Sequence, residues 1–416
     1  DVLRQWSTPH PEFAFLPRKF KIAIAGAAED RAAIGWHDVG LQLVRNDAGE
    51  IGFKVLVGGG MGRAPVIGSV IRDFLPWNQI LVYLEAVVRV YNRYGRRDNA
   101  YKARIKILVK AEGQKYFDQV EAEFRQILEN DPDGALHLIP QAELDRVAAC
   151  FTRPAGVEPL AEPAADADAP LAYQRWLARN VHAHQVPGWR AVTLSVKRAG
   201  QAPGDATDAQ LDAAADLADR FSFGELRVTH DQNLLLPWVK ASDLPAVHAA
   251  AKAAGYATPN IGLVTDMIAC PGGDFCDLAN ARSIPVAAEL TERFADLDEL
   301  WDLGEIDLHI SGCINSCGHH HSGHIGILGV DKDGSEWYQV TLAGSDGSAH
   351  APLAVPGKVI GPSFAASEIT DAVEAILDTY RELRQPDEKF IDALHRIGLD
   401  PFKAAANAQR TATARA

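Results

Sequence analysis

Hydrophobic and polar residues alternate with the period of a β-strand in two stretches of the chain, from Phe20 to Ala25 and from Arg190 to Val196. Two other stretches have the period of a helix. The first begins with a capping box, Thr207-Asp-Ala-Gln210, and continues with apolar residues at Leu211, Ala215, Leu217 and Phe221. The second spans about 367 to 383, with an apolar face made of Ile369, Val373, Ile376, Leu377 and Tyr380. This mixture predicts an α+β fold.

A pattern of strand, tight turn, strand and glycine occurs twice. It covers residues 39–58, with the turn Asn46-Asp-Ala-Gly49, and residues 325–344, with the turn Asp331-Lys-Asp-Gly334. The two predicted hairpins lie about 285 residues apart. Any two hairpins share these features, but the pattern also fits a duplicated α+β core built around one site.

Two composition changes mark segments without apolar periodicity. Residues 151–171 are rich in Pro, Ala and Asp, which predicts a linker or a surface insertion. Residues 403–416 contain no apolar residue larger than Ala, which predicts a disordered tail. With 416 residues in total, the chain is expected to fold as more than one domain.

Charge is distributed unevenly. The net charge is −14, but residues 1–150 carry 20 Lys and Arg against 19 Asp and Glu, and residues 151–416 carry 21 against 36. The negative net charge of the whole chain argues against nonspecific nucleic-acid binding. The longest apolar stretch, Ile80 to Val90, is interrupted by Glu85 and Arg89, so no membrane span is expected. No secretory leader is visible, and we expect a cytoplasmic protein.

Four of the five cysteines form two pairs, Cys270 with Cys276 and Cys313 with Cys317, whereas Cys150 stands alone and is expected in a core. Paired thiols in a chain without a secretory signal favour a metal centre over disulfides. The five-residue gap of the first pair is wide for one zinc ion, so an iron–sulfur cluster is favoured. Structural zinc and unliganded core cysteines remain the alternatives.

Glycines and histidines accompany the cysteines. Gly272, Gly273, Gly312 and Gly318 are expected where the backbone approaches inorganic sulfide. A strand from Ile306 to Ile310 is predicted to present Cys313 at its end. The run His319-His320-His321, with His324 nearby, could hold a separate metal, but packing and hydrogen bonding around the site are favoured.

Cations are concentrated between Arg89 and Lys110, where eight Lys and Arg residues face a single acidic residue, Asp98. A solvated helix face is the simplest interpretation. The alternative is an anion site made by Arg97, Lys102 and Arg104 with the loop at Gly58-Gly59-Gly60-Met-Gly62-Arg63, and such a density of cations suits a ligand with several carboxylates. Lys19 and Lys21 are predicted to share one face of a strand, which is costly unless an anion lies between them.

With these residues in place, the chain resembles the siroheme-containing sulfite and nitrite reductases, and most closely the assimilatory sulfite reductase hemoprotein component. Four motifs spread over nearly the whole chain support the resemblance: Leu16-Pro-Arg18-Lys19-Phe-Lys21, Leu56-Val-Gly-Gly59-Gly60, Thr229-His-Asp-Gln232-Asn233, and the two cysteine pairs. The cysteine set is the specific part. The resemblance also implies that the chain starts beyond an N-terminal portion of the family that supplies further arginines.

The resemblance implies a pseudo-twofold repeat of mixed α/β modules around a shared siroheme and [4Fe–4S] site. Residues 1–150 would form the first siroheme-binding module, 172–260 a ferredoxin-like half-domain, and 261–402 the second module. Cys270, Cys276, Cys313 and Cys317 would hold the cluster, with Cys317 bridging to siroheme. Lys19 and Lys21 would bind the substrate anion. Siroheme would lie among Arg18, Gly59, Gly60, Arg97, Lys102, Arg104, Gln232 and Asn315.

The expected function is the six-electron reduction of sulfite to sulfide in sulfur assimilation and cysteine biosynthesis. Nitrite reduction is the alternative enzyme, and a zinc-stapled structural or partner-binding protein is the alternative outside enzymes. A separate electron donor is expected, because the chain has no Gly-x-Gly-x-x-Gly fingerprint. The acidic chain would repel an acidic ferredoxin, so charge slightly favours a flavoprotein reductase.

Overall fold

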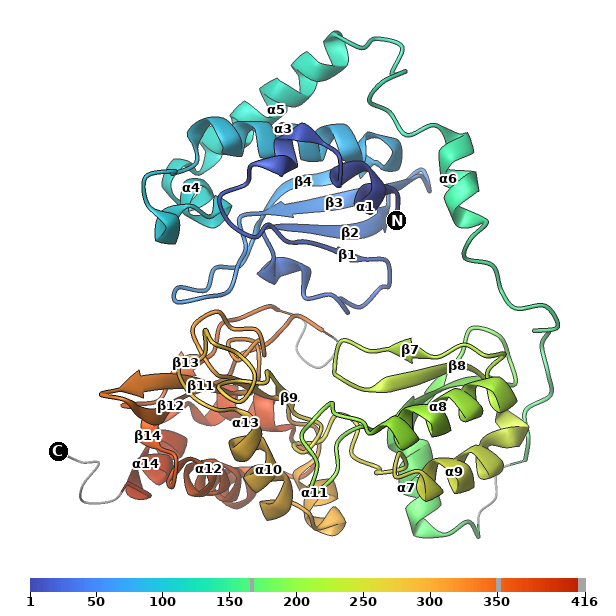
Figure 1. Cartoon of the computed structure of the whole chain (residues 1–416), viewed down its shortest axis with the longest axis vertical. Helices are drawn as coiled ribbons and strands as arrows, with labels where there is room; N and C mark the ends of the chain where they lie inside the picture. The colour runs from blue at the N-terminus through green and yellow to red at the C-terminus, as the bar shows by residue number, and fades with distance from the viewer. Residues whose placement is uncertain (165–167, 349–352, 411–416) are drawn as a thin grey trace. The chain divides into compact units, whose positions relative to one another are not determined.

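The computed structural model describes residues 1–164, 168–348 and 353–410, which form 14 α-helices and three β-sheets (Figure 1). The mixed α/β composition predicted from periodicity is confirmed. The chain divides into two compact units. One contains Asp1–Arg153 with the described residues of Ser345–Pro356, and the other contains the rest. The break at Arg153 lies inside the predicted linker 151–171, of which residues 165–167 are outside the described residues.

The first unit has a four-stranded sheet in the order β1-β2-β3-β4. Its strands are β1 (Ile22–Ala25), β2 (Val39–Arg45), β3 (Ile51–Val57) and β4 (Ser69–Pro76). β1 pairs with β2 in parallel, and the other pairs are antiparallel. The helices are α1 (Val2–Ser7), α2 (Pro11–Ala14), α3 (Ile80–Tyr94), α4 (Ile105–Glu112), α5 (Gln114–Glu129) and α6 (Gln141–Ala148).

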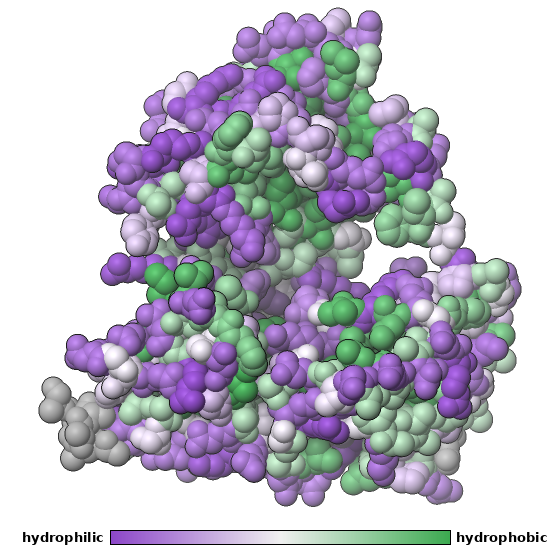
Figure 2. Space-filling model, viewed as in Figure 1, coloured by the Kyte–Doolittle hydropathy of each residue, from purple (hydrophilic) through white to green (hydrophobic). Residues whose placement is uncertain are grey.

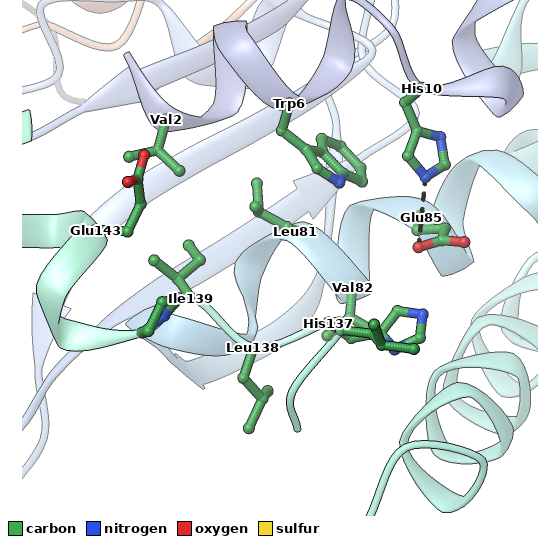
Figure 3. Close-up of a pocket in the computed structure, with 12 residues that line it drawn as sticks. Val2, Trp6, His10, Leu81, Val82, Glu85, His137, Leu138, Ile139 and Glu143 are labelled. Carbon is green, nitrogen blue, oxygen red and sulfur yellow. Dashed lines mark ion pairs between the residues drawn. The ribbon is translucent and has the colours of Figure 1, made fainter. Parts of the chain in front are cut away.

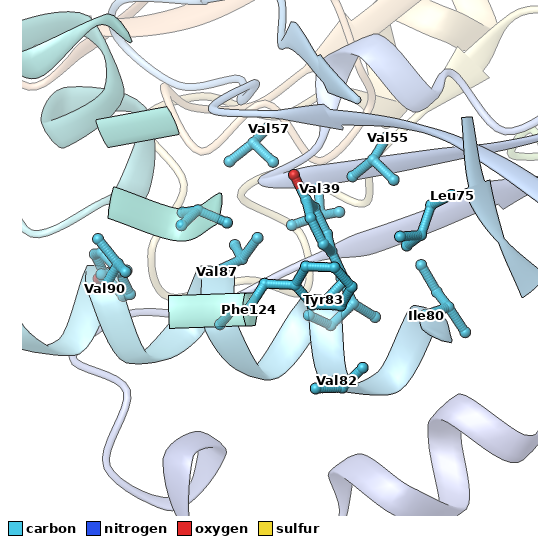
Figure 4. Packing of buried hydrophobic residues seen from close by; sticks show 14 of the residues in the cluster. Val39, Val55, Val57, Leu75, Ile80, Val82, Tyr83, Val87, Val90 and Phe124 are labelled. Carbon is cyan, nitrogen blue, oxygen red and sulfur yellow. The ribbon is translucent and has the colours of Figure 1, made fainter. Parts of the chain in front are cut away.

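The core of this unit lies between the sheet and α3. Val39, Val55 and Val57 point from the sheet toward Tyr83 and Val87 of α3 (Figure 4). All five side chains are completely excluded from solvent. The apolar stretch that is too short to cross a membrane is therefore a buried helix. Hydrophilic residues dominate the visible surface over α4 and α5 (Figure 2). Among the described residues, no helix combines the length and the apolarity that a bilayer requires.

The second unit contains two sheets. The smaller sheet has the order β5-β6-β8-β7 and carries α7 (Leu171–Asn180), α8 (Asp208–Phe221) and α9 (Leu244–Ala253). Its strands are β5 (Val181–Ala183), β6 (Trp189–Leu194), β7 (Arg227–Val228) and β8 (Leu234–Lys240).

The larger sheet of the second unit has the order β13-β12-β11-β10-β9, with β14 paired to β12. Its strands are β9 (Ile268–Ala269), β10 (Leu308–Ser311), β11 (Ile325–Lys332), β12 (Ser335–Leu342), β13 (Lys358–Val359) and β14 (Phe364–Ala365). The accompanying helices are α10 (Ile284–Arg293), α11 (Leu297–Leu303), α12 (Ile369–Leu383), α13 (Phe390–Ile397) and α14 (Asp400–Ala408).

Both predicted hairpins form. β2 pairs antiparallel with β3, with Val39 opposite Val57, and β11 pairs antiparallel with β12, with Ile325 opposite Leu342. In each sheet the first strand of the hairpin also has a parallel neighbour, β1 or β10. The two sheets thus share a local strand order, which is the form that a duplicated module takes. The pseudo-twofold arrangement of the modules remains a prediction.

Both predicted helices form, but α8 buries a different face from the one predicted. The capping box of α8 is present, with Thr207 and Gln210 bonded to each other's backbone N–H groups. Leu211 and Ala215 are nevertheless exposed, and α8 is buried through Ala214, Leu217 and Ala218. These three residues belong to the hydrophobic core that α8 shares with the smaller sheet and α9, and Leu211 lies outside that core. The apolar face predicted for α12 is completely buried.

The predictions for residues 403–416 and for Cys150 were wrong in the described residues. Helix α14 continues to Ala408, because alanine favours the helix and Ala406 is buried in the second unit. Residues 411–416 lie outside the described residues. Cys150 is exposed rather than part of a core. It follows α6, a helix that buries Val147 and leaves most of its surface to solvent.

Candidate iron–sulfur and anion-binding sites

The two cysteine pairs meet at one edge of the larger sheet. Cys270 directly follows β9, and Cys313 comes two residues after β10. β9 and β10 are parallel neighbours, so their carboxyl ends lie at the same edge. The backbone N–H of Cys270 continues the ladder by donating to the carbonyl of Ile310, at 3.1 Å. A strand that presents Cys313 at its end is thus confirmed.

The four thiols are close enough to influence one another. Burial raises the pKa of the Cys313 thiol, and Cys317, Cys270 and Cys276 raise it further, while the backbone N–H of Asn315 lowers it. The N–H of Gly312 donates to the sulfur of Cys270 at 3.1 Å. Four thiolates held together repel one another unless a cationic centre neutralises them. This donor set fits an iron–sulfur cluster.

The glycines around the cysteines are required by the protein's own backbone. A Cβ on Gly312 would lie 2.6 Å from the carbonyl oxygen of Ala281 and 2.7 Å from the Cα of Gly272. A Cβ on Gly318 would collide with the carbonyl oxygen of Ile310. The two cysteine loops therefore pack backbone against backbone, which explains these glycines without reference to inorganic sulfide.

A single-ion site is not formed by the part of the chain that the structure describes, where no three His, Cys, Asp or Glu side chains are arranged to hold one metal ion. A cubane cluster holds its thiolates farther apart than one zinc ion does. The zinc alternative therefore gains no support from the side-chain geometry.

The histidines pack beside the second cysteine loop. His320 is completely buried, and its Nδ1 lies 3.1 Å from the hydroxyl of Ser316. Burial lowers the pKa of His320 to about 2, and His321, His309 and His319 add to this effect. The rings of His320 and His321 lie 4.0 Å apart. His320 is thus neutral at pH 7, and the packing role favoured for this run agrees with the structure.

The lysine pair lies before the first strand rather than in it. β1 begins at Ile22, so the prediction that Lys19 and Lys21 share one face of a strand was wrong. The backbone N–H of Lys21 is bonded instead to the carboxylate of Asp38, at 3.0 Å. Arg18 and Lys19 are exposed, whereas Lys21 is half-buried. Lys21 also lowers the pKa of His37, which burial already lowers, so its charge is close to that imidazole.

The glycine loop after β3 is held by two cations. Lys106 is buried, and its ammonium donates to the carbonyls of Gly60, Met61 and Ala64 at 3.2, 3.0 and 2.6 Å. Arg104 donates to the carbonyl of Met61 at 2.8 Å. A Cβ on Gly60 would lie 2.5 Å from the Arg104 guanidinium, and one on Gly59 would collide with backbone carbonyls. These cations fix the shape of the loop.

The basic segment has more acidic partners than Asp98. Glu123, from α5, pairs with Arg89 at 3.2 Å and with Arg93 at 2.5 Å. Asp38, which is 1% exposed, pairs with Arg104 at 2.9 Å. Asp98 is the only acidic residue within the segment, and the fold adds these carboxylates from elements that are distant in sequence.

Arg97 and Lys102 of the basic segment are exposed to solvent. Arg97 lies over the ring of Tyr91 and donates to Asn92 at 2.9 Å, and Lys102, five residues further along the chain, is also exposed. Arg97 and Lys102 are therefore better placed than Arg104 to bind an added anion.

Gln232 and Asn315 lie next to cysteines. The Gln232 carboxamide makes two hydrogen bonds to Ala269, the residue before Cys270. Asn315 is exposed between Cys313 and Cys317. Sequence reasoning did not identify Lys197, whose buried ammonium donates to the carbonyls of Asp231 and Met267 and to Asp266. No local pattern marks this lysine, because its partners are 34 to 70 residues away.

A cavity of about 280 Å³ lies in the first unit, away from the predicted site residues (Figure 3). Trp6, Leu81 and Ile139 supply apolar walls. Its two carboxylates already have cationic partners, since Glu85 pairs with Arg89 and Glu143 with Arg146. Both carboxylates of this lining are therefore already paired.

The comparisons with known proteins agree with the cysteine geometry. The nitrite and sulphite reductase 4Fe-4S domain family matches residues 1–128 and 264–413, and the nitrite/sulfite reductase ferredoxin-like half domain matches residues 183–254. The chain therefore belongs to the nitrite and sulfite reductase 4Fe-4S family, a family of oxidoreductases.

Individual relatives include both kinds of reductase. The chain is 28% identical over 404 residues to "Sulfite reductase [ferredoxin] 2" of Mycolicibacterium paratuberculosis, covering 94% of this chain and 64% of the relative. It is 27% identical over 395 residues to "Assimilatory ferredoxin-dependent nitrite reductase" of Haloferax mediterranei, covering 92% and 62%. The chain thus spans less than two thirds of these relatives' lengths.

A solved structure supports the fold. The structure of the Mycobacterium tuberculosis NirA protein superposes with a TM-score of 0.69 at 26% identity, covering 96% of this chain and 67% of that one. The mixed α/β architecture is therefore shared with a protein of known structure.

Proposed function

We propose that this chain is part of an assimilatory sulfite reductase that reduces sulfite to sulfide with six electrons. The observation that supports it is the set of four thiols at the end of β9 and β10, in a family defined by its 4Fe-4S domain. Cys270, Cys276, Cys313 and Cys317 would hold the cluster. Siroheme, when bound, supplies the iron at which the oxyanion is reduced, and the cluster supplies electrons.

The chain's own residues would bind and orient the anions. Among the described residues, no carboxylate bonds to Arg97 or to Lys102, and both side chains are exposed, which suits the carboxylates of a tetrapyrrole. Lys19 and Lys21 would offset the charge of sulfite and donate protons as S–O bonds break. Arg18, Gly59, Gly60, Gln232 and Asn315 would complete the surroundings of siroheme. Arg104 would act indirectly, since it is bonded to Asp38 and Met61.

The experiment is a purification of the protein under anaerobic conditions. Siroheme absorption, five iron atoms per chain (four in the cluster and one in siroheme) and sulfite-dependent oxidation of reduced methyl viologen are expected. A colourless protein after reconstitution, with one zinc ion per chain, would reject the proposal in favour of a zinc-stapled scaffold.

Nitrite is the second candidate substrate, because relatives of both kinds match at 27 to 28% identity. Both oxyanions need a cationic pocket and several electrons. The ratio of kcat/KM for sulfite to that for nitrite on one preparation measures the discrimination. A ratio below one would assign the chain to nitrite reduction.

We further propose a ferredoxin as the electron donor, because relatives of both kinds carry ferredoxin in their names. This proposal replaces the flavoprotein reductase, which the net charge of the chain slightly favoured as the electron donor. Association with an acidic ferredoxin would require a local basic surface and would weaken with salt. Turnover with ferredoxin that falls as salt rises, alongside salt-independent turnover with methyl viologen, would support this donor. Turnover with a flavoprotein reductase alone would reject it.

A further inference from the structure

The first cysteine follows a strand at the edge of its sheet. β9 is the last strand in the order β13-β12-β11-β10-β9, and Cys270 bonds inward to Ile310 of β10. In a parallel pair, the backbone N–H and C=O of one residue point toward the neighbouring strand, and those of the next residue point away from it. Because the N–H of Cys270 points toward β10, the N–H and C=O of Ala269 face the open edge. A strand edge of this kind leaves backbone N–H and C=O groups unpaired unless another group bonds to them.

The partner is one side chain. The carboxamide nitrogen of Gln232 donates to the carbonyl of Ala269 at 2.8 Å, and its oxygen accepts from the N–H of Ala269 at 3.0 Å. These are the two bonds that a neighbouring strand would make. Gln232 therefore closes the sheet at the residue immediately before Cys270.

The backbone of Gln232 is arranged for this contact. Its φ is +59°, in the left-handed region that residues with a side chain rarely adopt. A glycine would enter this region freely but could not make the two bonds. The conformation is supported on either side, because Asn233 bonds to Asp266 at 2.9 Å and the buried Lys197 bonds to the Asp231 carbonyl at 2.8 Å.

We propose that Gln232 is a positioning residue for Cys270, and that through it the half-domain matched at residues 183–254 sets the position of the first cysteine of the cluster. The proposal rests on Cys270 being a cluster ligand, as proposed above. Gln232 acts through the backbone of Ala269 and need not touch the cluster. Replacing its carboxamide removes the hydrogen bonds that hold the strand edge and changes the position of the Cys270 sulfur relative to the cluster.

Three variants of the full-length, cluster-loaded protein test this. Gln232→Ala removes both bonds. Gln232→Gly also removes both, but it relieves the left-handed backbone. Gln232→Glu keeps the shape and one acceptor, while placing an oxygen against the Ala269 carbonyl. The control is Gln210→Ala in the same half-domain, because the carboxamide oxygen of Gln210 also accepts two hydrogen bonds, from the backbone N–H of Thr207 and the side-chain nitrogen of Gln201, away from the cysteines.

Two readouts are measured, the hydrogen exchange of the Ala269 amide and the electron paramagnetic resonance spectrum of the reduced cluster. We expect the Ala269 amide to exchange at least about tenfold faster in the Gln232→Ala and Gln232→Gly variants, with unchanged exchange at this amide in Gln210→Ala. The cluster spectrum should shift in all three Gln232 variants and not in the control.

A native exchange rate and spectrum in Gln232→Gly would show that residue 232 serves the turn alone, and would overturn the proposal. The same changes in Gln210→Ala would also overturn it, because they would reflect general loosening of the half-domain. Neither readout needs sulfite or nitrite turnover, so failure here is distinguishable from failure of the proposed activity.

Discussion

The ammonium of Lys197 lies 3.1 Å from a carboxylate oxygen of Asp266, and the two side chains are only 1% and 7% exposed. The same ammonium bonds to the carbonyls of Asp231 and Met267. It thus joins the loop before Gln232 to the segment that leads into Cys270. A buried ion pair of this kind is costly to break, because either partner alone is an uncompensated charge.

Replacing Lys197 by Met should therefore lower the free energy of unfolding by about 3–5 kcal/mol. The expected loss comes from leaving the buried carboxylate of Asp266 and the backbone carbonyls of Asp231, Asp266 and Met267 without their cationic donor. Urea denaturation of the two proteins at pH 7 measures it. The matched control is Arg227→Met, which breaks an exposed pair with Glu225 in the same half-domain and should change stability little. Equal losses in the two variants would contradict the account.

The buried imidazole of His320 should make the protein sensitive to mild acid. Its pKa falls from an ordinary 6.5 to about 2 in the folded chain. Below pH 6.5 the unfolded chain binds a proton that the folded chain does not, so stability falls as the pH falls, by about 1.4 kcal/mol per pH unit for this group.

His320→Gln should reduce that pH dependence. Unfolding free energies at pH 7 and pH 5 give the slope for each protein. His395→Gln is the control, because it removes an exposed imidazole from the same unit and should change the slope less than the loss of the buried His320 does. If the His320 variant keeps the full slope, the acid sensitivity belongs to another group.

Variants of Arg104 and Lys102 should distinguish a residue that supports the fold from one that binds the ligand. Arg104→Gln leaves Asp38 buried without its cation and frees the glycine loop, so a loss of about 2–3 kcal/mol in unfolding free energy is expected. Lys102→Gln should leave stability unchanged but lower the siroheme retained after purification. Denaturation and the absorbance of siroheme per chain measure the two effects. Unchanged siroheme content in the Lys102 variant would remove this residue from the proposed site.

Local signals in the sequence were sufficient for several features. The capping box of α8, both hairpins and the apolar face of α12 depend on residues close together in the chain, and all of them form. The cysteine spacing also indicated a site whose four thiols the fold brings together. These features follow from periodicity and turn chemistry, which a short window of sequence contains.

Features that depend on distant residues could not be predicted. The charge of the basic segment was overestimated because Glu123 and Asp38 approach it from other elements. The burial of Ala214 in place of Leu211 depends on which face of α8 the smaller sheet and α9 cover. Lys197 and Gln232 become informative once their partners near Cys270 are known.

The last prediction concerns the unequal environments of Cys317 and Cys270. Cys317 is exposed, whereas the sulfur of Cys270 is half-buried and accepts a hydrogen bond from Gly312. An exposed thiolate can serve a second metal centre, and a serine hydroxyl is a poorer and harder ligand than a thiolate. Cys317→Ser should therefore perturb siroheme absorption and reduction more than Cys270→Ser does, at matched iron content.

Visible spectra and reductive titrations of the two variants, compared at equal iron per chain, make this measurement. Cys270→Ser should instead mainly lower the amount of cluster that the protein retains. If the thiolates were equivalent, as in an isolated cluster, the two variants would give the same siroheme spectrum. Such identity would leave Cys317 as an ordinary cluster ligand and would exclude its thiolate as the connection to siroheme.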